Sequence, residues 1–95
     1  MRTIRLDSAV ENELYDARHK WERLDDAWGM IEWVLARDPT KGEPISESGL
    51  ARSFVFAGSI AHDMPDIQLI YVFEEPYVTI RSVQFRHPTD SAGRA

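Results

Sequence analysis

The sequence predicts an α+β fold in which two N-terminal antiparallel helices pack on a small antiparallel β-sheet. Three observations lead to this class. Apolar residues recur at helical spacing in the first third, Asp38-Pro39 stops that pattern, and the last third contains two runs rich in Ile, Val, Tyr and Phe. A chain of 95 residues has room for one hydrophobic core. We therefore expect a single domain over residues 1–88 and a flexible C-terminal tail over residues 89–95.

The helical part follows a short strand expected at residues 3–6. Ser8 and Glu11 have the spacing of a capping box, which predicts a helix start at this point. Apolar residues then recur every three or four positions, a spacing that a helix places on one face: Val10, Leu14, Ala17, Trp21, Leu24, Trp28, Ile31 and Leu35. One long helix would expose this stripe and imply an oligomer. Because helices in compact domains average about 11–12 residues, we expect two, the second over residues 27–37 with Asp25-Asp26 as its cap.

Asp38-Pro39 ends the second helix, because a residue before proline is pushed out of the α region and proline donates no backbone hydrogen bond. Residues 40–49 are then expected to form a long surface loop. A strand is expected over residues 50–57, and a second loop over residues 58–66 leads into the terminal hairpin.

The terminal hairpin joins residues 67–73 to residues 77–85. A three-residue loop would place Phe73 opposite Tyr77. Strict alternation then predicts one face with Ile70, Val72, Val78 and Ile80, and another with Leu69, Tyr71, Phe73, Arg81, Val83 and Phe85. It also places Arg81 and Arg86 on opposite faces unless a bulge intervenes. One face should carry the helices, which leaves the other to a loop, a tail or a partner chain.

Composition excludes several classes of site. The chain has no cysteine, which excludes disulfides, thiolate zinc sites and cysteine nucleophiles and is typical of a cytoplasmic protein. No apolar stretch approaches the roughly 20 residues that cross a bilayer, so we expect no membrane association. The net charge of −5 argues against broad nucleic-acid affinity. His62, Asp63 and Asp66 fit no defined metal spacing, and we expect neither a metal nor a cofactor.

The order of expected elements resembles that of the RelE/ParE toxin superfamily of toxin–antitoxin systems. The resemblance is carried by the helix exit and loop Ala36-Arg37-Asp38-Pro39-Thr40-Lys41-Gly42-Glu43-Pro44-Ile45, by Arg52 at the head of the next strand, by the strand over residues 67–73, and by the closing strand Val83-Gln84-Phe85-Arg86. It implies a RelE/ParE-like fold and a toxin-like protein neutralised by an antitoxin.

The resemblance implies two modes of action. In the ribonuclease branch, which cleaves mRNA on the ribosome, Arg52 and Arg86 would stabilise the scissile phosphate, and His87 would act as proton donor. Gln68 departs from this pattern, because the family usually has an arginine there. In the other branch the target is a protein such as gyrase, so the sequence leaves open whether the chain is an enzyme.

A second hypothesis needs no chemistry. A small, non-enzymatic α+β interaction module could dimerise through the apolar sheet face or the helix stripe, and its arginines would then serve as surface charges that protect strands.

Overall fold

The computed structural model describes residues 1–88, which form two helices and a five-stranded mixed sheet, so the predicted α+β class is confirmed. The elements follow one another as β1 (Thr3–Leu6), α1 (Ser8–Arg18), α2 (Leu24–Arg37), β2 (Glu43–Pro44), β3 (Ala51–Phe56), β4 (Asp66–Glu74) and β5 (Tyr77–Arg86). The tail predicted at residues 89–95 lies outside the described residues. Within the described part, neither helix is long and apolar enough to cross a membrane.

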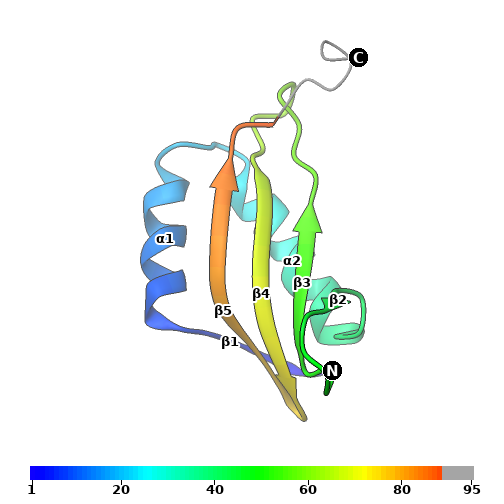
Figure 1. Cartoon of the computed structure of the whole chain (residues 1–95). Helices are drawn as coiled ribbons and strands as arrows, with labels where there is room; N and C mark the ends of the chain where they lie inside the picture. Colours follow the sequence, from blue (N-terminus) through cyan, green and yellow to red (C-terminus); the bar gives the residue numbers. More distant parts are fainter. Residues whose placement is uncertain (89–95) are drawn as a thin grey trace, which may run out of the picture.

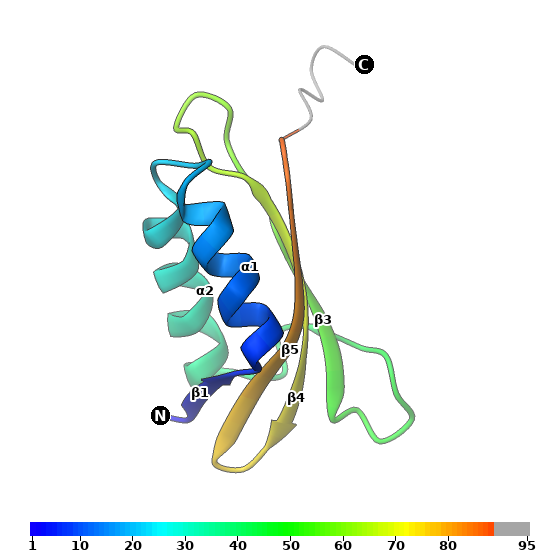
Figure 2. The same ribbon diagram turned by 90° about the vertical axis from the view of Figure 1, so that its left-hand side faces the viewer.

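Both helices lie on one side of the sheet and run antiparallel to each other (Figures 1 and 2). The strand order is β1-β5-β4-β3-β2. The prediction of a wholly antiparallel sheet was wrong, because β1 pairs parallel with β5, from Thr3 opposite Tyr77 to Leu6 opposite Ile80. The chain passes through both helices and the rest of the sheet before β5 returns beside β1, and such a crossover connection permits parallel pairing.

The apolar stripe of the first third is divided between two helices, as predicted, except that Trp21 lies in the turn between them, and all eight of its residues are buried. The helix starts differ from those expected. Asp7, and not Ser8, is the N-cap residue of α1, and its carboxylate pairs with Arg81 at 2.7 Å. The second helix begins at Leu24, three residues before the predicted start, with Arg23 as its N-cap residue.

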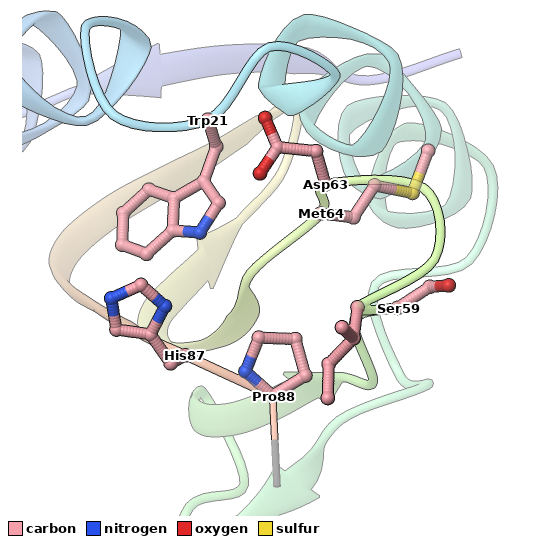
Figure 3. A pocket seen from close by; sticks show the side chains of 7 residues that line it. Trp21, Ser59, Asp63, Met64, His87 and Pro88 are labelled. Atoms are coloured by element: carbon pink, nitrogen blue, oxygen red, sulfur yellow. The ribbon is translucent and has the colours of Figure 1, made fainter. Parts of the chain in front are cut away.

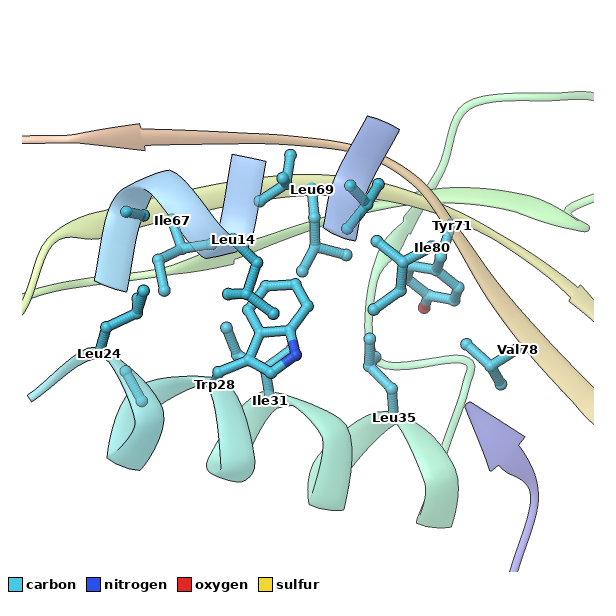
Figure 4. Packing of buried hydrophobic residues seen from close by; sticks show 14 of the residues in the cluster. Leu14, Leu24, Trp28, Ile31, Leu35, Ile67, Leu69, Tyr71, Val78 and Ile80 are labelled. Carbon is cyan, nitrogen blue, oxygen red and sulfur yellow. The ribbon is translucent and has the colours of Figure 1, made fainter. Parts of the chain in front are cut away.

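The core lies between the helices and the covered face of the sheet (Figure 4). Leu24, Trp28, Ile31 and Leu35 project from α2 toward the sheet, where they meet Ile67, Leu69, Tyr71, Val78 and Ile80. The single polar atom of the Trp28 side chain, Nε1, donates a hydrogen bond to Glu32 at 2.9 Å. Burial of this apolar surface is the main force that holds the helices on the sheet.

The hairpin register differs by one residue from the prediction. Glu74 pairs with Tyr77, so the loop has two residues, Glu75 and Pro76, and Val78 lies opposite Phe73. From the loop as far as Tyr71 and Ile80, the buried residues of both strands therefore lie on the covered face. The prediction that Val78 and Ile80 lie on the opposite face from Tyr71 was wrong.

A β-bulge then corrects the alternation. Tyr71 pairs with Ile80 while Ile70 pairs with Ser82, which leaves Arg81 without a partner in the ladder. The extra residue keeps Val83 on the covered face. The core-facing residues of β4 and β5 thus all lie on the covered face, and the candidate site lies on the other face.

Candidate functional site

One face of the sheet carries no helix, and we call it the open sheet face (Figure 2). Its residues alternate with the core-facing residues: Thr3 and Arg5 of β1, Glu43 of β2, Ala51, Ser53 and Val55 of β3, Asp66, Gln68, Ile70, Val72 and Glu74 of β4, and Tyr77, Thr79, Ser82, Gln84 and Arg86 of β5. The connection between β2 and β3 extends from the sheet on this side (Figure 2). Exposed Ile45 and Leu50 lie on that connection.

The open sheet face combines apolar and hydrogen-bonding groups. Val55 is 65% exposed, and Ile70 and Tyr77 are 36% and 37% exposed. Solvent-exposed aliphatic side chains on adjacent strands, surrounded by Ser, Thr and Gln, have the composition of a protein-binding surface with an apolar centre and a polar rim.

The open sheet face carries charges of both signs. The guanidinium of Arg5 lies 3.8 Å from the ring centroid of Tyr77, which is a cation–π contact. Arg5 and Arg86 share this face with Glu43, Asp66 and Glu74, so the face carries one excess negative charge, whereas the chain carries −5.

Arg86 lies at the end of the open sheet face. It borders a hollow of about 220 Å³ whose other lining residues are Val55, Ala57, Asp66, Ile67, Gln68 and Gln84. Its Nη2 donates to Gln84 Oε1 at 3.0 Å, and within residues 1–88 the guanidinium forms no ion pair. Arg86 is therefore available to a ligand.

Arg52 lies on the covered side of the sheet and binds the loop that follows α2. Its Nε donates to the Gly49 carbonyl at 2.8 Å, and its Nη1 donates to the carbonyls of Gly42 at 2.9 Å and Thr40 at 3.2 Å. These bonds to three backbone carbonyls hold residues 40–49 in place. This role alone explains why an arginine is at this position.

Tyr71 holds the same loop from inside the core. Its hydroxyl donates to the Pro39 carbonyl and accepts the Gly42 backbone N–H at 3.1 Å. Burial raises the pKa of the Tyr71 hydroxyl. The segment expected to be a plain surface loop is thus anchored at both Pro39 and Gly42, which are buried, and it contains the short strand β2.

Asp38 begins this loop. A hydrogen bond from the Thr40 hydroxyl, at 2.6 Å, lowers the pKa of the Asp38 carboxyl, and the Thr40 backbone N–H at 3.1 Å adds to the effect. The aspartate that stops α2 therefore also turns the chain toward the Tyr71 anchor.

His87 directly follows Arg86, but its ring packs against the turn between the two helices. Its ring centroid is 5.4 Å from that of Trp21, and Figure 3 shows the two rings on one side of a hollow of about 250 Å³. Asp63 also borders this hollow, and its carboxylate accepts the Glu22 backbone N–H at 2.8 Å. This contact ties the loop after β3 to the turn between the helices.

The three residues predicted as catalytic are not brought together. Arg52 pairs with Tyr71 and Arg86 pairs with Asp66, five residues earlier on β4, which corresponds to about 17 Å along a strand. Arg52 and Arg86 also point to opposite faces, and His87 packs on Trp21. Within residues 1–88 no cluster of three His, Cys, Asp or Glu side chains could hold a metal ion.

Sequence reasoning did not single out Val55, Ile70 or Tyr77 as surface residues, and for Ile70 and Tyr77 the cause was the wrong hairpin register. One signal could have corrected it. Core-facing residues of the last strand, Val78, Ile80, Val83 and Phe85, are spaced by two, three and two, and the single interval of three marks a bulge.

No family model, curated protein or solved structure matches this chain.

Proposed function

We propose that this chain is the toxin-like component of a toxin–antitoxin system, that it acts by binding a protein target through the open sheet face, and that an antitoxin neutralises it by covering that face. The observation that carries this proposal is the uncovered sheet face with exposed Val55, Ile70 and Tyr77 at its surface.

Two further observations support the proposal. Apart from the two-residue strand β2, the chain has the element order on which the resemblance to the RelE/ParE superfamily depends: a short strand, two helices, and three strands that end in Arg86. The loop over residues 40–49, whose first part up to Ile45 belongs to that resemblance, is fixed by Arg52 and Tyr71.

The geometry favours a protein target, such as gyrase, over ribosomal mRNA. Cleavage of a phosphodiester would require cationic and proton-transferring groups within reach of one phosphate. Arg86 is accessible, but Arg52 is bound to backbone carbonyls and His87 packs on Trp21.

The test is expression of the chain in a bacterial host, alone and together with the small protein encoded beside it. The proposal predicts growth arrest by the chain alone, recovery on co-expression, and co-purification of the two proteins. Unaffected growth together with no binding of the neighbouring protein would refute it. Mapping of mRNA ends in arrested cells separates the branches: binding to a protein target leaves the mRNA uncut, whereas a nuclease would produce new ends.

A second candidate is a non-enzymatic interaction module that dimerises. It is favoured by a separate observation, the exposed Met30 and Trp33 on the outer side of α2, which are 55% and 57% exposed.

A further inference from the structure

The outer side of α2 has a line of four residues whose order is self-complementary. Asp26, Met30, Trp33 and Arg37 recur at intervals of four, three and four, so at 3.6 residues per turn they lie within about 60° of arc. This line is opposite the side that buries Leu24, Ile31 and Leu35. It is therefore the part of α2 farthest from the core, and α2 presents it to solvent.

The two central residues of the line are apolar and exposed. Met30 and Trp33 are the large side chains of α2 that the sheet and α1 leave uncovered. The guanidinium of Arg37 lies 4.2 Å from the Trp33 ring centroid, which orients the indole along the helix surface. An exposed tryptophan beside a methionine is typical of an interface centre.

The two ends of the line have opposite charges. Asp26 lies in the first turn of α2 and Arg37 in the last, about 16 Å away along the axis. Arg23 binds one oxygen of the Asp26 carboxylate at 2.6 Å, and the other oxygen has no hydrogen bond within the described part of the chain. Arg37 forms no ion pair within residues 1–88.

We propose that this line is a homodimer interface, in which α2 of one copy packs antiparallel on α2 of a second copy. A two-fold axis that passes between residues 31 and 32 places Asp26 opposite Arg37 of the second copy, and Met30 opposite its Trp33. One operation thus pairs both charges and both apolar residues, and each contact occurs twice, as an isologous interface requires. A partner of different sequence would not need this palindromic order.

Gly29 makes close approach of the two helices feasible. A Cβ built at Gly29 would have no neighbouring atom within 4 Å, so the space beside it is open. Gly29 lies about 70° to one side of the line, and its missing side chain lets this flank of α2 approach the second copy. Helix pairs with small residues at the contact lie near the close end of the usual range of about 8–10 Å between axes.

This inference is independent of the toxin proposal, because the line on α2 and the open sheet face are on opposite sides of the molecule (Figure 2). One helix from each copy covers less area than the roughly 1,600 Å² of a standard interface, so we expect a weak dimer that dissociates on dilution. Sedimentation velocity over a micromolar dilution series measures it.

The decisive comparison uses two charge variants, Asp26→Arg and Arg37→Asp. Each variant alone places like charges opposite each other at both ends of the interface and should weaken dimerisation by roughly tenfold or more. An equimolar mixture of the two variants restores both opposite-charge pairs in a heterodimer and should dimerise within about threefold of the wild-type affinity. Trp33→Glu should also weaken the dimer by roughly tenfold or more.

Control variants separate this interface from others. Lys20→Asp changes an exposed charge outside the line, and Tyr15→Glu changes an exposed aromatic residue of α1; both should leave the dimer intact. Circular dichroism checks that each variant is folded. A wild-type chain that stays monomeric throughout the series, a dimer that persists in Trp33→Glu, or a mixture as monomeric as its two components would overturn the proposal.

Discussion

The hydroxyl of Tyr71, on the central strand β4, accepts the backbone N–H of Gly42 at 3.1 Å, 29 residues earlier in the chain. The same hydroxyl donates to the Pro39 carbonyl. Tyr71 is fully buried, so its hydroxyl supplies the hydrogen bonds that water would otherwise give to two backbone groups of the loop. The edge of the sheet therefore depends on one phenol in the core.

Replacing Tyr71 with phenylalanine should destabilise the protein by about 1–3 kcal/mol, because the Gly42 N–H and the Pro39 carbonyl would be buried without partners. Urea denaturation measures the change. The matched control is Tyr77→Phe, since the Tyr77 hydroxyl forms no hydrogen bond within residues 1–88 and its ring is on the surface. A surface change of this kind should stay within about 0.5 kcal/mol, and equal losses in the two variants would contradict the anchoring role.

Stability should also fall at alkaline pH through Tyr71. Burial raises the pKa of this hydroxyl in the folded protein, so above about pH 10 the unfolded chain loses this proton while the folded chain keeps it. The contribution is fully present below the unfolded pKa and is lost as pH rises through the folded pKa. Denaturation series above this pH should show a shallower decline for Tyr71→Phe than for the wild type. Identical slopes would exclude Tyr71 as the titrating group.

Two glycines should respond in opposite directions to alanine. A Cβ at Gly42 would lie 2.6 Å from the Ser53 carbonyl oxygen and 2.8 Å from the Tyr71 hydroxyl, so Gly42→Ala should cost about 1–3 kcal/mol. Gly29 lies inside α2 with open space around it, so Gly29→Ala should gain about 0.5–1 kcal/mol of helix stability. Thermal unfolding at low protein concentration compares them, and a stabilised Gly42→Ala variant would show that the loop does not pack as described.

The Asp38 carboxyl should titrate below the ordinary aspartate range. The Thr40 hydroxyl and backbone N–H bind its charged form, which lowers its pKa. Because the folded pKa is lowered, the contribution of this group is present above the unfolded pKa and is lost as pH falls through the folded pKa. Carbon-detected NMR measures the pKa directly. Thr40→Val removes the side-chain donor and should raise the pKa toward its usual value, and an unchanged titration would contradict the hydrogen bond.

The elements could be predicted from the sequence wherever one periodicity dominated. The apolar stripe from Val10 to Leu35 specified the helices and their buried faces, and Asp38-Pro39 specified where the second one ends. The parallel placement of β1 beside β5 could not be predicted in this way. Four residues such as Thr3–Leu6 can pair in either direction, and only the packing of the intervening helices decides which.

The candidate site was less predictable than the elements. A single extra residue at Arg81 reverses the side on which later residues of β5 lie, and strict alternation has no means to place it. Arg52 binds three carbonyls that only the folded loop brings within its reach, because Gly42 and Gly49 are ten and three residues away in the sequence. Residue type alone thus suggested a catalytic arginine where the fold uses a loop anchor.

Growth arrest by variants of the open sheet face tests whether this face binds the target. Ile70→Glu puts a charge at the apolar centre of that face, and Tyr15→Glu puts the same charge on the helix side. If the open sheet face binds the target, Ile70→Glu should abolish arrest while it remains folded and expressed at the wild-type level, and Tyr15→Glu should arrest growth like the wild type. Full arrest by a folded Ile70→Glu variant would contradict the account.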